Sequence, residues 1–193
     1  MNSVKLWQLY ILPFIVVFIL LSLETLNIKI GGLISFHELV KSSTSVVQIN
    51  PENLQKALVA KVIDGDTIEI DSGEHVRFIG VDTPETVHPK KSIQCYGKEA
   101  SNKMKSLLSN KWIYLEKDVS ETDRYGRLLR YIYLPNPDNP AEAIFIEEYL
   151  IENGYGKVIT YPPDVKHHDK LLVAQKNAQA ENRGLWRKCQ INY

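Results

Sequence analysis

The chain has 193 residues, with 23 Lys and Arg against 23 Asp and Glu and 44% hydrophobic residues. This length fits one ordinary domain with an appendage and excludes a large multidomain protein. The two cysteines are too few for a disulfide-rich miniprotein or a four-cysteine zinc site. The balanced charge excludes a polycationic nucleic-acid coat, so any nucleic-acid binding must depend on a local cluster or on a bound cation.

The first segment of the chain is strongly apolar. Residues 6–23 are 18 residues without a charge, close to the minimum for a membrane-spanning helix. A buried core helix normally carries a polar stripe, and Gln8 and Ser22 do not form one. No cleavage site with small residues follows, so we expect an uncleaved transmembrane anchor, with a cleaved signal peptide as the alternative. The flanking charges do not orient the segment.

The segment after the anchor differs from the rest of the chain. Residues 24–57 show no hydrophobic period and include Gly and Ser clusters, so we interpret them as a linker. A folded domain is expected over 58–189, with short tails at 1–5 and 190–193.

Within that domain, predicted strands come first and predicted helices follow. Runs of apolar and β-branched residues predict five short strands, over 58–63, 67–70, 75–81, 112–116 and 128–133. Apolar residues at helical spacing predict three helices, over 96–109, 147–153 and 165–182. The pattern indicates an α+β domain with a small antiparallel barrel that carries helices.

Four acidic residues lie at the ends of the early strands: Asp64, Asp66, Asp82 and Glu85. Turns favour Asp for backbone reasons, so Asp64 and Asp66 alone indicate a hairpin. The second pair adds two carboxylates three residues apart, with Pro84 stiffening the backbone between them. If the first and third strands pair, Asp66 and Asp82 converge at one end of the barrel. With a backbone carbonyl they form an all-oxygen site suited to Ca²⁺.

Two arginines accompany these acids. Arg77 lies on the strand that leads to Asp82, and Arg127 follows the run 123–126. Each can be explained singly as a surface ion pair. Beside a bound cation, two guanidinium groups match the oxygens of a five-coordinate phosphate. A carboxylate outside the metal site can then deprotonate water, and Glu85 is the candidate.

Four motifs, in order along the chain, resemble those of the staphylococcal nuclease (thermonuclease) family. They are Ile63-Asp64-Gly65-Asp66-Thr67, the run 77–85, Tyr96-Gly97-Lys98-Glu99-Ala100 and Asp123-Arg124-Tyr125-Gly126-Arg127. The match continues to Gly184-Leu185-Trp186 and covers about residues 58–189. The resemblance implies an oligonucleotide-binding (OB) type five-stranded barrel with three helices. It also implies Ca²⁺-dependent hydrolysis of DNA and RNA with little sequence specificity, leaving 3′-phosphate ends.

The same resemblance implies roles for individual residues. The positions where the family binds Ca²⁺ are Asp66, Asp82 and the carbonyl of Thr83. The positions of its catalytic residues are Arg77, Glu85 and Arg127. The positions that contact substrate are Lys91, Arg124, Tyr125 and Tyr161. Arg124 stands where the family often has Lys, and Thr160-Tyr161-Pro162-Pro163 stands where the staphylococcal enzyme has a pair of tyrosines.

Cys95 and Cys189 also fit the resemblance, because many exported relatives carry cysteines at these places. A disulfide between them is implied, with two free buried thiols as the alternative. Such a bond requires an oxidising compartment.

We therefore predict a phosphodiester hydrolase that is held in the cell membrane by residues 6–23, with its nuclease domain outside the cytoplasm. If the segment is cleaved, the protein is secreted. The expected substrates are DNA and RNA, the expected cofactor is Ca²⁺, and a monomer without an obligate protein partner is expected. Two other classes remain: a non-catalytic binding module, which typically loses these acids and arginines, and a membrane-tethered adhesion or scaffold protein.

Overall fold

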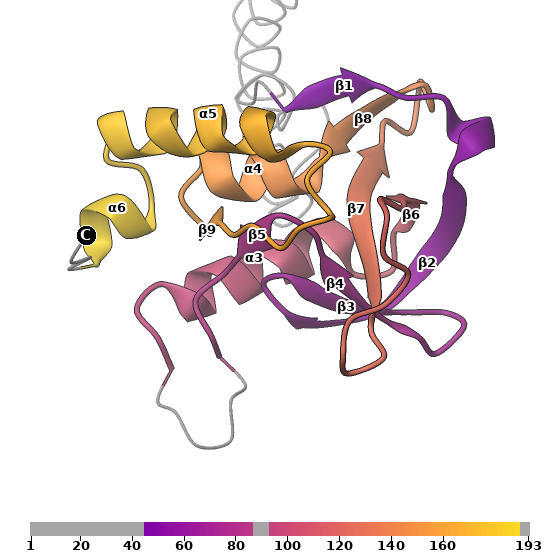
Figure 1. The fold of residues 1–193 in the computed structure, drawn as a ribbon, viewed down its shortest axis with the longest axis horizontal. Coiled ribbons are helices and arrows are strands. Elements are labelled where there is room, and N and C mark those ends of the chain that lie inside the picture. The colour runs from indigo at the N-terminus through magenta and orange to yellow at the C-terminus, as the bar shows by residue number, and fades with distance from the viewer. Residues whose placement is uncertain (1–44, 87–92, 190–193) are drawn as a thin grey trace, which may run out of the picture. The chain divides into compact units, whose positions relative to one another are not determined.

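The computed structural model describes residues 45–86 and 93–189 (Figure 1). The predicted anchor over 6–23, the tails at 1–5 and 190–193, and Lys91 lie outside these ranges. Among the helices within them, none combines the length and the apolar character needed to cross a membrane.

Five strands form a closed barrel. They are β2 (Gln55–Asp64), β3 (Thr67–Ile70), β4 (His75–Phe78), β6 (Trp112–Glu116) and β7 (Leu128–Pro135). Their order is β7-β4-β3-β2-β6, and the barrel closes because β6 also pairs with β7. The predicted five-stranded barrel with helices is thus confirmed, and it is consistent with the OB-type fold.

One strand pairing differs from the antiparallel barrel that we expected. Strands β4 and β7 are parallel, with Val76 opposite Leu128. The two strands are separated in the chain by a helix (α3, Gly97–Leu108) and by β6, so no hairpin constrains them to run in opposite directions.

The barrel interior is filled by apolar side chains from alternate strand positions. Five of these side chains, one from each strand, are completely buried: Val59, Ile68, Val76, Ile113 and Ile132. Successive residues of a strand face opposite sides of the sheet, which is why the apolar alternation in the sequence predicted these strands.

Two further strands extend the sheet beyond the barrel. Strand β8 (Glu142–Phe145) pairs with β7, and β1 (Val46–Gln48) pairs with β8. A short 3₁₀ helix, η1 (Pro51–Asn53), connects β1 to β2. The residues of β1 and η1 fall inside the predicted linker over 24–57, so the folded domain begins before Leu58. The three residues of β1 are too few to show a period in the sequence.

The three predicted helices are present, with a short fourth. They are α3, α4 (Ile146–Glu152), α5 (His168–Ala180) and α6 (Leu185–Lys188). In Figure 1, α4 and α5 lie together, above the two-stranded antiparallel sheet formed by β5 (Val81–Asp82) and β9 (Lys157–Val158).

A polar cluster lies between the barrel and the start of α5. The carboxylate of Glu116 accepts hydrogen bonds from the Tyr133 hydroxyl at 2.7 Å and from Lys166 Nζ at 2.6 Å, and its Oε2 lies 2.8 Å from Nε2 of His167. Burial alone would raise the pKa of Glu116, but hydrogen bonds from His167, Lys166 and Tyr133 lower it to about 2. The folded state therefore favours the ionised form of this carboxyl group.

Glu116→Gln should lower the free energy of unfolding near pH 7 by about 2 kcal/mol. Because the folded pKa is depressed, the stabilisation is complete above the usual pKa of 4.5 and is lost as the pH falls towards about 2. The difference between variant and wild type should therefore shrink between about pH 5 and pH 3, as urea unfolding curves at each pH can measure. An equal difference at every pH would contradict this.

Candidate active site

The turn between β2 and β3 holds the segment that follows β5. The Oδ2 of Asp66 accepts hydrogen bonds from the amide of Thr83 at 2.8 Å and from its hydroxyl at 2.9 Å. The carboxylate of Asp64 accepts hydrogen bonds from the hydroxyl of Thr86 at 2.6 Å and from its amide at 3.2 Å. A Cβ at Gly65 would lie 2.6 Å from Oγ1 of Thr83, so the two segments approach this closely only with glycine in the turn.

Asp66 and Asp82 do come together, but not by the predicted route. Strand β3 lies between β2 and β4, so the first and third strands do not pair. Instead, both carboxylates contact the guanidinium group of Arg77. Its Nη1 lies 3.0 Å from Asp66 Oδ2, and its Nη2 lies 3.3 Å from Asp82 Oδ1.

The surroundings of Asp82 and Asp64 make the ionised forms of their carboxyl groups less favourable, so both pKa values are raised. The pKa of Asp82 is raised, first by burial and then by the charge of Asp66, against the lowering effects of Arg77 and Lys157. Burial also raises the pKa of Asp64, and a hydrogen bond with the side chain of Glu85 raises it further, although hydrogen bonds from Thr86 and Gly65 oppose this. A cation near these groups would relieve this repulsion.

The donor set fits a hard cation such as Ca²⁺. The two carboxylates face the same guanidinium group, and their ligand atoms are all oxygen. Among the described residues, no group of three or more His, Cys, Asp and Glu side chains surrounds one position. A site here would therefore need main-chain or water oxygens besides Asp66 and Asp82.

All six residues predicted for catalysis and metal binding line one cleft of about 370 Å³. They are Asp66, Arg77, Asp82, Thr83, Glu85 and Arg127. The side chain of Arg77 is 15% exposed and that of Arg127 is 30% exposed, so Arg127 is the more accessible of the two.

Arg127 is held by a tight turn. Its Nε and Nη2 both lie 2.7 Å from Oδ2 of Asp123. The same aspartate accepts hydrogen bonds from the amides of Tyr125 and Arg127 through Oδ1. The turn closes through Gly126, whose φ of +81° lies in the region that only glycine adopts without strain. The arginine is thus fixed by its own loop.

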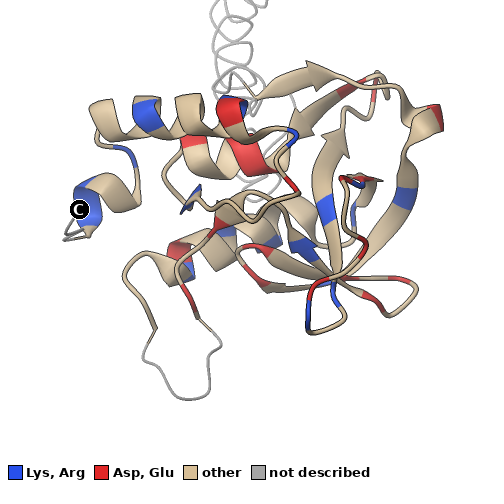
Figure 2. Ribbon diagram, viewed as in Figure 1, with Lys and Arg blue, Asp and Glu red and all other residues tan. Residues whose placement is uncertain are grey.

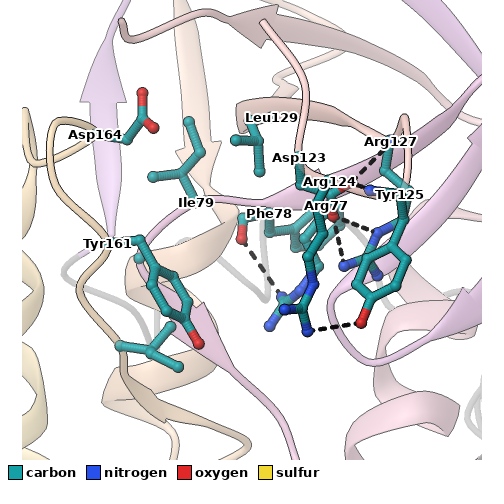
Figure 3. Close-up of a pocket in the computed structure, with 12 residues that line it drawn as sticks. Arg77, Phe78, Ile79, Asp123, Arg124, Tyr125, Arg127, Leu129, Tyr161 and Asp164 are labelled. Atoms are coloured by element: carbon teal, nitrogen blue, oxygen red, sulfur yellow. Dashed lines mark hydrogen bonds and ion pairs between the residues drawn. The ribbon is translucent and has the colours of Figure 1, made fainter. Parts of the chain in front are cut away.

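A second cleft of about 490 Å³ adjoins the first and shares Arg77 and Arg127 with it. Figure 3 shows Tyr161 and Tyr125 on opposite sides of this cleft, with Arg77 and Arg124 between them. The two tyrosines are 69% and 68% exposed, respectively. Arg124 donates to the Tyr125 hydroxyl at 2.7 Å and lies 4.8 Å from the centre of its ring. Exposed aromatic rings beside arginines are suited to bases and phosphates of a single strand.

Charge is mixed over the rest of the molecule. Acidic and basic residues occur on most elements in Figure 2, in keeping with the zero net charge of the chain. Within residues 45–86 and 93–189, the arginines of the two clefts are therefore the groups best placed to attract a polyanion.

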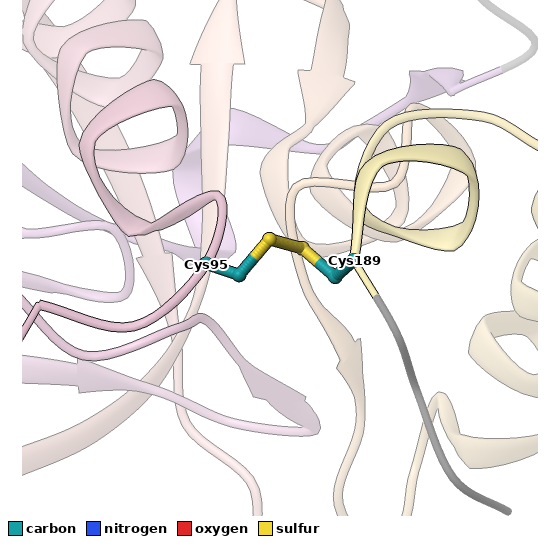
Figure 4. Close-up of a disulfide and its surroundings, with 2 residues drawn as sticks. All are labelled: Cys95 and Cys189. Carbon is teal, nitrogen blue, oxygen red and sulfur yellow. A yellow bond between two sulfur atoms is a disulfide. The ribbon is translucent and has the colours of Figure 1, made fainter.

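Cys95 and Cys189 are joined by a disulfide (Figure 4), with their Cα atoms 5.9 Å apart. The bond links the turn before α3 to the residue that follows α6. The two cysteines are 94 positions apart in the sequence, so the bond closes a long loop and lowers the conformational entropy of the unfolded chain.

Sequence reasoning gave no role to four residues that the structure places around the site. They are Asp64, Gln94, Asp123 and Lys157, the last with Nζ 3.9 Å from Asp82 Oδ2. Asp64 and Asp123 both stand inside motifs that had been recognised, and Asp123 lies four residues before Arg127. Gln94 gave no signal, because its side chain binds a backbone amide, that of Glu85, and such a bond leaves no pattern in the sequence.

Comparison with known proteins identifies the family of the chain. The family described as staphylococcal nuclease homologue matches residues 75–188. The thermonuclease of Staphylococcus hyicus is 42% identical over 137 residues, which are 69% of this chain and 77% of that protein. The thermonuclease of Staphylococcus intermedius is 41% identical over 151 residues, which are 77% of this chain and 82% of that protein. Endonuclease YncB of Bacillus subtilis is 32% identical over 144 residues, 72% of this chain and 65% of that protein. The chain therefore belongs to the staphylococcal nuclease family and is a nuclease, a phosphodiester hydrolase.

Proposed function

We propose that the protein is a Ca²⁺-dependent endonuclease that hydrolyses DNA and RNA with little sequence specificity and leaves 3′-phosphate ends. The observation that carries this proposal is the convergence of Arg77, Glu85 and Arg127 with Asp66 and Asp82 in one cleft. A binding module or a scaffold has no need for this combination of a base, two guanidinium groups and paired carboxylates.

Glu85 is the proposed general base. It lines the same cleft as the carboxylates of Asp66 and Asp82 and the guanidinium group of Arg127. Its carboxylate takes a proton from a water molecule as the water oxygen attacks phosphorus. The leaving group is then the 5′ oxygen of the next nucleotide, so the phosphate stays on the 3′ side.

The two arginines stabilise the charge that develops on the phosphate. Nε and Nη2 of Arg127 contact Asp123. The third guanidinium nitrogen, Nη1, does not contact Asp123 and can point into the cleft. Arg77 lies beside both carboxylates and lines both clefts, so it can contact the phosphate from another side. Groups held in place before the reaction need little reorganisation during it.

Asp66, Asp82 and the Thr83 carbonyl are the proposed ligands of Ca²⁺. When bound, the ion would polarise a phosphate oxygen and help to position water. Arg124, Tyr125 and Tyr161 would bind the flanking nucleotides, since they line the adjoining cleft. These contacts involve rings and phosphates and not base edges, which accounts for low sequence specificity.

Purified full-length protein should convert a covalently closed plasmid to linear and then shorter fragments when Ca²⁺ is present. Closed circles have no ends, so their cleavage requires an endonuclease. The new 5′ ends should accept a labelled phosphate from a kinase without prior phosphatase treatment, because they carry hydroxyl groups. An RNA without free ends should be cleaved in the same assay. New 5′ ends that accept label only after phosphatase treatment would contradict the proposed direction of cleavage.

We also propose that the nuclease domain lies outside the cytoplasm, anchored by residues 6–23 or released after their cleavage. The disulfide supports this location, because such bonds persist in oxidising compartments. Intact cells that express the protein should therefore degrade plasmid added to the medium, and protease added outside should destroy that activity. Activity that appears only after cell lysis would place the domain inside.

A further inference from the structure

The proposed base lies on a segment whose main chain is held from several sides. Thr83, two residues before it, donates hydrogen bonds to Asp66, and Thr86, the residue after it, donates hydrogen bonds to Asp64. Glu85 itself is bound by a residue of the segment that precedes α3, Gln94.

Gln94 makes two hydrogen bonds with the main chain of Glu85. The amide of Glu85 donates to Oε1 of Gln94 at 2.9 Å. The amide of Gln94 donates to the carbonyl oxygen of Glu85 at 3.0 Å. Because the amide and the carbonyl of one residue are both bound by the same partner, the backbone of Glu85 cannot rotate without breaking at least one bond.

Gln94 is in turn fixed by its neighbours. Its carbonyl oxygen accepts a hydrogen bond from the amide of Gly97 at 3.0 Å, in the turn that begins α3. A Cβ at Gly97 would lie 2.9 Å from the carbonyl oxygen of Pro84, so this turn packs directly against the segment of the base. Cys95, the residue after Gln94, is joined to Cys189 (Figure 4).

The disulfide matters because this region is open to solvent. Gln94 and Cys95 are both exposed, and water competes for hydrogen bonds at an exposed site. A covalent link one residue from Gln94 restricts the movements that would separate it from Glu85.

We propose that Gln94 is a positioning residue for Glu85 and that the Cys95–Cys189 disulfide keeps Gln94 in place. This inference rests on the proposed function, since it assumes that Glu85 is the base. Gln94 acts through the backbone of Glu85, whose orientation sets the direction of the carboxylate in the cleft.

The test compares kcat and KM of the full-length protein with those of variants. Gln94→Ala removes the side-chain acceptor, so kcat should fall about 10- to 100-fold while KM changes little. Gln94→Glu keeps an acceptor oxygen and should restore most of kcat. The matched control is Asn50→Ala, which removes an oxygen that accepts a hydrogen bond from the amide of Glu52 in η1, at 3.2 Å. This control should leave kcat unchanged.

A double variant distinguishes positioning from a general structural role. In a Glu85→Gln background, Gln94→Ala should reduce kcat no further, because no base remains to be positioned. A full additional loss would overturn the inference. The inference would also be overturned if Gln94→Ala had the kcat of the wild type while Glu85→Gln was impaired. The proposed function would stand in that case. Wild-type kcat in Glu85→Gln would overturn both.

Reduction tests the second half of the proposal. Reduced wild-type protein, with both thiols confirmed by titration, should lose kcat by a factor similar to that of Gln94→Ala. Reduction of the Gln94→Ala variant should add no loss. Unchanged kcat in the reduced wild type would overturn the role of the disulfide. Circular dichroism shows whether the reduced protein is folded. The kinetic comparison of the Gln94 variants uses oxidised protein with the disulfide intact, so it does not depend on how reduction affects folding.

Discussion

Glu85→Gln should lower kcat by about 10²–10⁴-fold and leave the fold intact. The amide has nearly the shape of the carboxylate but cannot take a proton, so the attacking water would no longer be deprotonated. Steady-state cleavage of a short oligonucleotide, with circular dichroism of the same sample, measures both quantities. Glu74→Gln is the matched control, because Glu74 is exposed at the β3–β4 turn and does not line the cleft. Near-normal kcat in folded Glu85→Gln would refute the role of this residue.

Substitution of the arginines should also lower kcat by a large factor, but through lost stabilisation of charge and not through lost proton transfer. Arg127→Ala removes a guanidinium group that we propose to contact the phosphate, and a loss of about 10²–10³-fold in kcat is expected. Arg127→Lys keeps the charge but not the paired geometry with Asp123, so it should restore little. Arg77→Ala should also destabilise the protein, because Arg77 bridges Asp66 and Asp82. Its kinetics need to be compared at a temperature where both proteins are folded.

Removal of Ca²⁺ should abolish activity. Asp82→Ala should raise the Ca²⁺ concentration for half-maximal rate by about 10-fold or more, because a ligand is lost while the other ligands remain. Asp82 is the cleaner choice of ligand for this test. Asp66 also accepts two hydrogen bonds from Thr83 and forms an ion pair with Arg77, so its removal would disturb the segment of the base.

A readout that does not depend on turnover separates binding from catalysis. Ca²⁺ at about 100 times its dissociation constant should stabilise the wild type by about 2.7 kcal/mol and raise its Tm. This stabilisation should be much smaller in Asp82→Ala. Full activity in excess chelator, or an equal rise of Tm in both proteins, would show that these residues do not hold a catalytic ion.

Much of the barrel and of the candidate site was predictable from local patterns. Alternation over 67–70 and 112–116 predicted β3 and β6 with the observed bounds, because a strand that faces a core on one side must alternate. The candidate catalytic and metal residues lie in short sequence motifs, so each could be identified from its type and its position in the motif.

The remaining features depend on contacts that no local sequence pattern shows. The parallel pairing of β4 with β7 and the addition of β1 to β8 have no local signature, since strand partners are selected by packing. The two bonds between Gln94 and Glu85 likewise arise only because the turn before α3 folds back on the segment after β5. A linear pattern shows which residues can donate or accept a hydrogen bond. Only the folded chain brings a donor within 3 Å of its acceptor, in the geometry that a hydrogen bond requires.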